Sequence, residues 1–551
     1  MPENILFYFT LLAMLCGSAL LMRRIVGKTK LIIFSVFFIS VMIYLLTFAA
    51  ADYFTGEGIN DAVLYHLRYG LGGAGFKEYS LLIVASILTI LISFLFVLGF
   101  RVFRMQKREG KRLVNSSVLP SALVAAAVVF SPTTAGLLPY VSFDIQDNEV
   151  QTQQFSQYYE NTPIKQTAER PKNLVYIYAE SLERSYFDEN IFPELITELR
   201  DLESIATTFT QIHEVRKTGW TIGGIVASQC GIPLITPSHG NSMGGMDAFL
   251  PTSQCLGDSL SEAGYELSVF NGSSLEFSGL KKFFVSHGIK NIYGLKELTE
   301  LLDDKNYVNS WGLYDDSVFK IALDEFYDKS SGNKPFGLFI STMDTHHPNG
   351  HVSSLCEGEE WGIAVNPVLN AVKCSDRLIG NFIRQIISSE YADDTVIVIT
   401  SDHLAMRNSA THRLERVPER RNLFMVIEPS KIGERIDREG SMLDVASTIL
   451  PYLGFSGNIG LGRNLSDNQS LLSTITDFDA VLASWDKEIA KFWDFPEIRP
   501  TDSLYVDSEN KSIKFNKREF RYPLLIEFDD DYSSTVRFQF DASKEHKKLS
   551  E

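Results

Sequence analysis

Three long apolar runs at the N-terminal end of the chain most constrain what it can fold into. The runs are Ile5–Met22, Leu31–Ala50 and Tyr79–Phe100, and none contains a charged residue. A helix needs about 20 consecutive apolar residues to cross the hydrocarbon core of a bilayer. Each run therefore predicts a transmembrane helix, and the chain is expected to have a lipid bilayer as a partner.

A fourth apolar run, Leu119–Val141, is long enough to cross a membrane but is interrupted by Pro132 and Pro139. It is expected to cross with a kink or to lie partly at the interface. A cleaved signal peptide is the alternative for the first run, but Met1–Asn4 contains no basic residue. The sequence thus predicts a multi-pass transmembrane domain of about four helices over residues 1–143.

Basic residues cluster after the first and the third run. Short loops rich in lysine and arginine stay on the cytoplasmic side of a membrane, so both loops are predicted to be cytoplasmic. The N-terminus, the loop Ala51–Glu78 and everything after the fourth run then lie outside the cytoplasm. The basic residues are Arg23, Arg24, Lys28 and Lys30 in the first loop, and Arg101, Arg104, Lys107, Arg108, Lys111 and Arg112 in the second.

The part outside the cytoplasm is strongly acidic. Of the 51 basic and 68 acidic residues in the chain, 12 and 9 lie within residues 1–150, which leaves a net charge of −20 on the remainder. Such a charge repels the phosphate backbone of nucleic acids. No nucleic-acid partner is expected.

Four of the five cysteines lie in this outer part. An even number of cysteines in an oxidising compartment predicts two disulfide bonds. Proximity in the sequence favours the pairs Cys230–Cys255 and Cys356–Cys374. Metal binding by these cysteines is the weaker alternative, because no pair has the spacing C-x-x-C.

Short apolar strands alternate with helical patterns after residue 172. Such alternation is typical of an α/β domain with a mostly parallel sheet, here expected over residues 173–476. The glutamine-rich stretch 144–172 is interpreted as a linker. Residues 477–551 are expected to form a small subdomain, with a helix over 480–492, three strands and a disordered tail from residue 541. The strands predicted in the α/β domain are Leu174–Tyr178, Leu267–Phe270, Phe336–Ser341, Thr395–Thr400 and Leu423–Ile427.

Potential metal ligands follow three of these strands. Glu180 follows the first strand, His346 and His347 follow the third, and Asp402 and His403 follow the fourth. In open α/β sheets the ligand crevice lies outside the carboxyl ends of the strands. Each residue alone is more often a structural hydrogen-bonding group, but their joint placement predicts one site.

Thr218 begins a segment of another kind. It is followed by the small and apolar run Ile222–Cys230 and then by Gly231, which predicts a helix from near Thr218 to Gly231. The backbone N–H groups and the positive end of the helix dipole would then face a ligand at Thr218. The alternative is that Thr218 only caps the helix.

Five segments of the outer part carry a family resemblance. They resemble the motifs of the phosphoglycerol transferases that decorate periplasmic glucans in Gram-negative bacteria, and more broadly the lipoteichoic-acid-synthase branch of the sulfatase/alkaline phosphatase superfamily. The resemblance covers roughly residues 1–470. The segments are Tyr178–Ser181, Thr218–Thr221 with Ser228–Pro233, Trp311–Asp316, Asp344–Pro348 and Ser401–His403.

The resemblance implies a metal site and a nucleophile. Glu180, Thr218, Asp402 and His403 would ligate one divalent metal, and Thr218 would be the nucleophile. Two hard carboxylates and one imidazole favour Mn²⁺ first and Mg²⁺ second. Coordination to a dication makes the alkoxide of a threonine accessible at neutral pH.

The resemblance also implies substrate-binding residues. His346 falls where the family binds phosphoglycerol, and His347 is its neighbour in sequence only. The synthase branch holds the head group with a tryptophan and an arginine, but spacing places Ser278 and Leu280 at these positions. Lys281 or Lys282 is a candidate to supply the missing charge.

The chemistry implied is phosphoryl transfer. True sulfatases need a cysteine or serine in the motif C-x-P-S-R, which this chain lacks. Thr218 is expected to attack phosphatidylglycerol and to pass phosphoglycerol to a periplasmic oligosaccharide, at the bacterial inner membrane. A phosphoethanolamine transferase is the alternative within the superfamily. A catalytically inactive membrane scaffold or sensor is the alternative of another class.

Overall fold

The structure is a computed structural model. It describes residues 3–22, 28–55, 58–69, 80–106, 118–141, 154–161, 163–236, 248–358, 360–362, 366–429 and 431–494, and six strands between residues 497 and 539. The chain divides into two compact units, which are described separately. One comprises residues 1–64 and 75–149, and the other residues 65–74 and 150–551.

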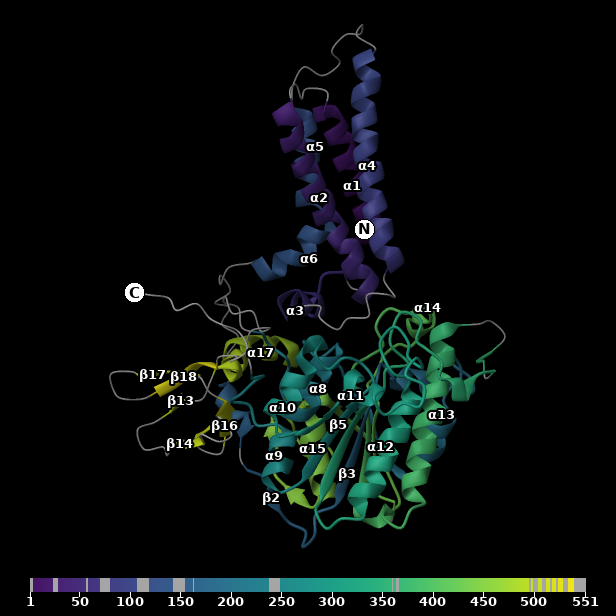
Figure 1. The fold of residues 1–551 in the computed structure, drawn as a ribbon, viewed down its shortest axis with the longest axis vertical. Helices are drawn as coiled ribbons and strands as arrows, with labels where there is room; N and C mark the ends of the chain where they lie inside the picture. Colours follow the sequence, from purple (N-terminus) through teal and green to yellow (C-terminus); the bar gives the residue numbers. More distant parts are fainter. Residues whose placement is uncertain are drawn as a thin grey trace. The chain divides into compact units, whose positions relative to one another are not determined.

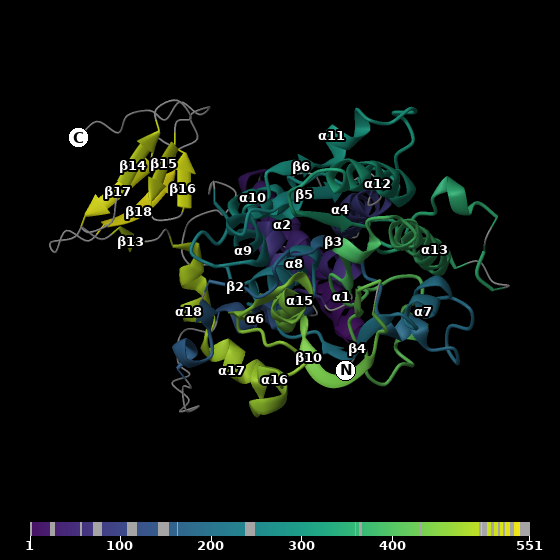
Figure 2. The same cartoon turned by 90° about the horizontal axis from the view of Figure 1, so that it is seen from below.

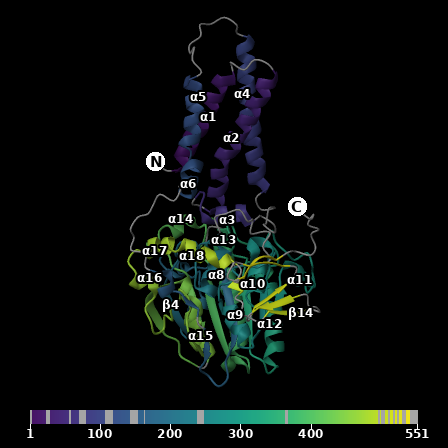
Figure 3. The ribbon, with the colours of Figure 1, turned by 90° about the vertical axis from the view of Figure 1, so that its left-hand side faces the viewer.

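The first unit is a helical bundle. Figures 1 and 3 show α1, α2, α4 and α5 running alongside one another. Their mutual contacts bury Met14, Phe38, Leu45 and Ala127, while many other apolar side chains remain exposed, as a lipid environment requires. The helices are α1 (Glu3–Met22), α2 (Lys28–Thr55), α4 (Ser80–Gln106), α5 (Val118–Val129) and α6 (Pro132–Val141).

Two described helices are long and apolar enough to cross a membrane, over Ile5–Met22 and Thr29–Tyr53. A third span arises if α5 and α6 are counted as one, and they bend by 49° at the predicted proline break. In α4, the described apolar stretch Ser80–Phe96 is shorter than a full span, so the third predicted span stays a prediction. The chain is a membrane-anchored protein with a soluble domain.

The soluble domain is built on an eight-stranded sheet in the order β10-β4-β9-β8-β3-β7-β5-β6. All neighbouring strands are parallel except β9, which is antiparallel to both β4 and β8. The mostly parallel α/β sheet predicted from the sequence is confirmed. The strands are β3 (Asn173–Ala179), β4 (Ala206–His213), β5 (Glu266–Asn271), β6 (Asn291–Tyr293), β7 (Phe336–Ser341), β8 (Thr395–Ser401), β9 (Phe424–Ile427) and β10 (Arg435–Ser441).

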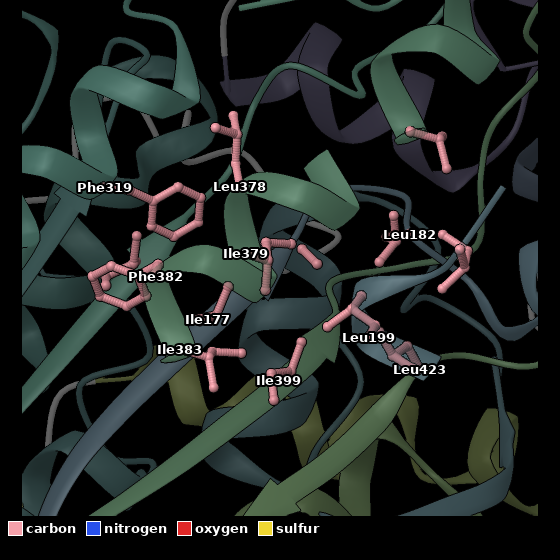
Figure 4. Packing of buried hydrophobic residues seen from close by; sticks show 14 of the residues in the cluster. Ile177, Leu182, Leu199, Phe319, Leu378, Ile379, Phe382, Ile383, Ile399 and Leu423 are labelled. Carbon is pink, nitrogen blue, oxygen red and sulfur yellow. The ribbon is translucent and has the colours of Figure 1, made fainter. Parts of the chain in front are cut away.

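Helices cover both faces of this sheet. Figure 2 shows α12 (Asp315–Ser330) and α13 (Pro367–Ile387) on one side of β3, and α15 (Val445–Leu453) on the other. Side chains alternate along the central strand, so Ile177 packs with Phe382 of α13 (Figure 4). On the opposite face the hydroxyl of Tyr178 accepts a hydrogen bond from Gln229 of α8 (Thr221–Cys230). Burial on both faces explains the continuous apolar runs of the central strands.

The C-terminal region contains strands, as predicted. It forms two three-stranded antiparallel sheets, β13-β18-β17 and β14-β15-β16 (Figure 2). The helix predicted over 480–492 is interrupted, as α17 and α18 are followed by a 3₁₀ turn. The predicted tail from residue 541 lies outside the described residues. The elements are α17 (Phe478–Ser484), α18 (Asp486–Ala490), η8 (Lys491–Trp493), β13 (Glu497–Ile498), β14 (Leu504–Asp507), β15 (Ser512–Phe515), β16 (Arg518–Arg521), β17 (Leu524–Phe528) and β18 (Ser534–Gln539).

Part of the predicted linker is structured. Strand β1 (Glu160–Asn161) pairs with β12 (Ile459–Gly460), and β2 (Lys165–Gln166) pairs with β11 (Phe455–Ser456). Residues 154–172 therefore join the soluble domain, and the stretch that connects the two units is shorter than the sequence suggests.

Both predicted disulfide bonds are present. Cys230 pairs with Cys255 with Cα atoms 4.0 Å apart, and Cys356 pairs with Cys374 with Cα atoms 5.7 Å apart. The first bond joins the end of α8 to the start of α9 (Leu256–Glu262). The second joins a loop to α13. All four cysteines are therefore structural, and the alternative of metal binding by them does not hold.

Candidate active site

Three of the four predicted metal ligands, Glu180, Asp402 and His403, converge at the carboxyl ends of two adjacent strands. Ala179 of β3 lies opposite Ser401 of β8, so the residues that follow them are neighbours. Ligand atoms of Glu180, Asp402 and His403 all lie within 4.8 Å of one another. The Nε2 atom of His403 is 3.6 Å from a carboxylate oxygen of Glu180 and 3.4 Å from one of Asp402.

Hydrogen bonds orient each of these three side chains. The backbone N–H groups of Ser181 and His403 donate to Asp402 at 3.0 and 2.9 Å, and the Ser181 hydroxyl donates to Glu180 at 2.9 Å. The Nδ1–H of His403 donates to the carbonyl of Leu404 at 2.8 Å. The lone pair of His403 Nε2 is therefore free to bind a metal between the two carboxylates.

The burial and charge of Glu180, Asp402 and His403 favour binding of a cation. All three side chains are almost fully buried. Burial and the neighbouring Asp402 carboxylate raise the pKa of Glu180 well above its usual value. A divalent ion would remove this repulsion, and two carboxylates with one imidazole form a donor set that fits Mn²⁺ or Mg²⁺.

Thr218 lies in the turn that leads into α8. Its side chain is buried, and its hydroxyl donates to the carbonyl of Val215 at 2.7 Å. The helix begins at Thr221, three residues later than expected, because Trp220 is in an extended conformation. The cap position is therefore held by Trp220, and the interpretation of Thr218 as a helix cap is wrong. The helix ends at Cys230 and is capped by Gly231, in agreement with the predicted end.

The start of α8 packs directly against the backbone of Asp402, which follows β8. A Cβ atom on Gly224 would lie 1.7 Å from the carbonyl oxygen of Asp402. The Thr221 hydroxyl lies 3.5 Å from the carboxylate of Glu180. The small residues after Thr218 thus allow the helix start to approach the three ligands.

Two glutamates that no sequence pattern singles out hold the chain beyond His403, and of these Glu183 is buried and Glu214 is half-buried. Glu214 accepts a hydrogen bond from the backbone N–H of Leu404 at 2.8 Å, and burial raises the pKa of its carboxyl. Glu183 accepts from the N–H of Ala405 at 2.8 Å and forms an ion pair with Arg420. Neither glutamate has a sequence spacing that marks it, so only tertiary contacts reveal them.

The loop after β7 is tied to the same site. The backbone N–H of Glu180 donates to the Thr342 hydroxyl at 2.9 Å, and the Thr345 hydroxyl donates to the Glu180 carbonyl. Asp315, which lies in the segment Trp311–Asp316 of the family resemblance but was assigned no role there, accepts from the N–H groups of Met343 and Asp344 at 2.7 and 3.0 Å. These contacts fix the backbone that carries the two histidines.

His346 and His347 are buried side by side, with ring centroids 4.6 Å apart. The Nδ1–H of His346 donates to the carbonyl of His347 at 2.8 Å, which leaves its Nε2 atom as an acceptor. Burial lowers the pKa of His346 well below its usual value, and lowers that of His347 to about 4. Both rings are therefore neutral at pH 7.

The two candidate lysines are placed differently. Lys281 is exposed, and its ammonium lies 3.5 Å from the carboxylate of Glu276. Lys282 is half-buried on the same short helix, α10 (Leu280–Ser286). Ser278 and Leu280 are both buried. The contacts of Lys281 point to a surface ion pair, so its role in substrate binding stays a prediction.

Comparisons with known proteins identify the family of this chain. A family model described as Phosphoglycerol transferase I, N-terminal domain, matches residues 3–145, and a model described as Sulfatase matches residues 172–455. Phosphoglycerol transferase I of Escherichia coli K12 is 37% identical over 506 residues, which cover 90% of this chain and 65% of the relative. The protein of the same name from Shigella flexneri is 36% identical with the same coverage.

The chain thus spans 65% of the length of these relatives. Among solved structures, the lipoteichoic acid synthase LtaP from Listeria monocytogenes is 14% identical, with a TM-score of 0.45 over 70% of this chain and 88% of its own. The sulfatase model alone matches more than half of the chain. The chain belongs to the sulfatase family.

Proposed function

We propose that this chain is a phosphoglycerol transferase that moves phosphoglycerol from phosphatidylglycerol to a periplasmic oligosaccharide. The observation that carries the proposal is the convergence of Glu180, Asp402 and His403 beside the start of α8. Thr218, in the turn before that helix, is the candidate nucleophile and fourth ligand. The 37% identity to phosphoglycerol transferase I supports the same activity.

The proposed reaction has two steps. The Thr218 oxygen attacks phosphorus, the bond from phosphorus to the diacylglycerol oxygen breaks, and diacylglycerol leaves with a proton. An acceptor hydroxyl then attacks the phosphorus of the phosphoglyceryl-threonine, the bond from phosphorus to the Thr218 oxygen breaks, and the proton that the acceptor loses returns to Thr218. A bound divalent ion, Mn²⁺ by preference, would lower the pKa of the threonine hydroxyl and screen the phosphate charge.

The chain's own residues supply the remaining functions. We expect the neutral Nε2 of His346 to contact the phosphoglycerol group, with the ring of His347 stacked on that of His346. The Thr345 and Thr342 hydroxyls hold Glu180 at the carboxyl end of β3. These groups position and orient, and the reacting oxygen comes from Thr218.

The proposed location is the inner membrane of a bacterium, with the α/β domain in the periplasm. Two disulfide bonds support an oxidising compartment, and the basic loops support the orientation. A tethered domain also meets its lipid donor at a high effective concentration. A phosphatase-type reporter fused after Gln153 should be active and one after Lys107 inactive, whereas the reverse pattern would contradict the orientation.

The function is tested by presenting purified full-length protein with vesicles of head-group-labelled phosphatidylglycerol or phosphatidylethanolamine, with manganese and with or without glucan. Release of diacylglycerol and transfer of label from phosphatidylglycerol are expected. Use of phosphatidylethanolamine alone would favour the phosphoethanolamine transferase. Turnover of neither lipid would favour the inactive scaffold.

A further inference from the structure

A row of aromatic rings connects the segment between the second and third apolar runs to the active site. His66, which belongs to the same compact unit as the soluble domain, stacks on Phe277 with ring centroids 5.0 Å apart and planes at 11°. The rings of Phe277 and Trp311 pack edge to face with centroids 5.6 Å apart, and the ring centroids of Trp311 and His346 are 4.0 Å apart. The row thus reaches the histidine proposed to contact phosphoglycerol.

Tyr65 anchors the beginning of this row. Its side chain is buried, and its hydroxyl donates to the carbonyl of Ser278 at 2.6 Å. The ring centroids of Tyr65 and Trp220 are 5.9 Å apart, and Trp220 is two residues beyond Thr218. The segment is therefore packed against both the turn of Thr218 and the residues beside Phe277.

Three ring nitrogens around this row have no hydrogen-bond partner among the described residues. They are Nδ1 of His66, Nε1 of Trp220 and Nδ1 of His347, and each of these atoms is buried. The side chains of Trp220 and His347 are 4% and 6% exposed. A buried polar group without a partner is costly, so such groups in a native protein usually have a ligand or an ordered water to bind.

The chemistry of these groups selects the ligand. The indole N–H of Trp220 can only donate, so it needs an oxygen acceptor. A neutral imidazole both donates and accepts, which matches a hydroxyl group. Burial lowers the pKa of His66 to about 4, so its ring is neutral at pH 7. An ammonium group offers no acceptor to Trp220, whereas each hydroxyl of a glycerol does.

We propose that His66 and Trp220 bind the hydroxyl groups of the glycerol head group, and that His66 is a specificity-determining residue contributed by the segment between the second and third apolar runs. The site deepens the proposed function, on which it rests. The aromatic faces of Phe277 and Trp311 cover the carbon atoms of the head group. The ring nitrogens replace the water that the hydroxyls lose on binding.

The test compares two substrates of full-length protein in detergent with manganese. One is phosphatidylglycerol, and the other is bis(4-nitrophenyl) phosphate, a phosphodiester without a polyol. His66→Phe keeps a ring on Phe277 but removes both nitrogens. It should lower kcat/KM for phosphatidylglycerol about tenfold more than for the aryl phosphodiester, the effect of losing one hydrogen bond. Trp220→Phe should act in the same direction.

Leu67→Ala is the matched control, because Leu67 lies on the same helix, α3 (Asp61–Tyr69), and is 64% exposed. It should change neither rate constant. If His66→Phe and Trp220→Phe lower kcat/KM equally for both substrates, the row is only structural and the head-group site is overturned.

Inhibition separates this proposal from the proposed function. Free glycerol phosphate should inhibit hydrolysis of the aryl phosphodiester more strongly than phosphoethanolamine does, and His66→Phe should remove the difference. That result would support the head-group site even if the protein did not turn over phosphatidylglycerol. Failure to turn over phosphatidylglycerol would contradict only the proposed reaction. Equal inhibition of the unmodified protein by both compounds would overturn the site.

Discussion

The Nε2 atom of His403 lies 3.6 Å from a carboxylate oxygen of Glu180, although the two residues follow different strands. The two residues meet because β3 and β8 are parallel neighbours that end at the same edge of the sheet. With Asp402 they form a buried group of side chains that could hold a metal ion. Four predictions test this site and the fold around it, and a fifth tests the nucleophile.

The first prediction concerns the metal. Asp402→Asn and His403→Ala should each weaken metal affinity at least about tenfold, since each removes one ligand from a site of few ligands. Excess manganese should then restore part of the activity. Titration of activity and of bound metal with manganese measures both effects. Asp393→Asn, which changes an exposed carboxylate, is the control, and equal metal affinity in all variants would contradict the assignment.

The second prediction concerns the packing of α8 against the backbone of Asp402. Gly224→Ala should displace Asp402, because the new Cβ atom would lie 1.7 Å from its carbonyl oxygen. Both the melting temperature and the manganese affinity should fall. Gly99→Ala is a suitable control, as a Cβ atom there meets nothing within 4 Å. Unchanged manganese affinity in Gly224→Ala would show that the helix start does not support the site.

The third prediction concerns the disulfide bonds. They close loops of 25 and 18 residues, for which the loss of unfolded-state entropy stabilises the fold by about 3 kcal/mol each. Peptide mapping without reduction should join Cys230 to Cys255 and Cys356 to Cys374, and reduction should lower the melting temperature. Free thiols at these positions in protein isolated from cells would argue against an oxidising compartment.

The fourth prediction concerns pH. Burial raises the pKa of Asp444 from 3.8 to about 6, although the carboxylate accepts N–H groups of Ser441 and Arg463. The native state then binds the Asp444 proton more tightly than the unfolded state does. The protonated carboxyl therefore adds to the free energy of unfolding at low pH, and this contribution is lost as the pH rises from about 4 through 6. The loss amounts to at most about 3 kcal/mol.

Asp444→Asn lacks this titration and serves as the reference. The melting temperature of the unmodified protein minus that of the variant should decrease between pH 4 and pH 7. A difference that stays constant over this range would show that the carboxyl titrates normally in the folded protein.

The sequence predicted the centre of the fold better than its edges. Strands β3, β7 and β8 are continuous apolar runs because both faces are covered, and Glu180 and Asp402 follow them directly. Strands β4 and β10 were missed because polar residues interrupt both. Strand β10 lies at the edge of the sheet, where a polar strand is tolerated.

The site was predicted only in part for a related reason. Glu180, Asp402 and His403 stand at strand ends, where topology brings ligands together. Glu214 acts through the backbone of Leu404, and His66 comes from between two apolar runs. Such contacts join distant parts of the chain without any local pattern, so no spacing could reveal them.

The central claim is that Thr218 carries the transferred group. Thr218→Ala should still fold, because its hydroxyl makes one hydrogen bond to the Val215 carbonyl, worth about 1 kcal/mol. It should lose nearly all turnover at any manganese concentration, whereas Thr218→Ser should keep part of it. Circular dichroism and melting temperature confirm that each variant is folded.

The most direct measurement is mass spectrometry of the protein after incubation with labelled phosphatidylglycerol and manganese, without an acceptor. The account predicts release of diacylglycerol and a phosphoglyceryl group on the peptide that contains Thr218. The group should disappear when glucan is added and should be absent from Thr218→Ala. A label on another residue, or normal transfer by Thr218→Ala, would contradict the account.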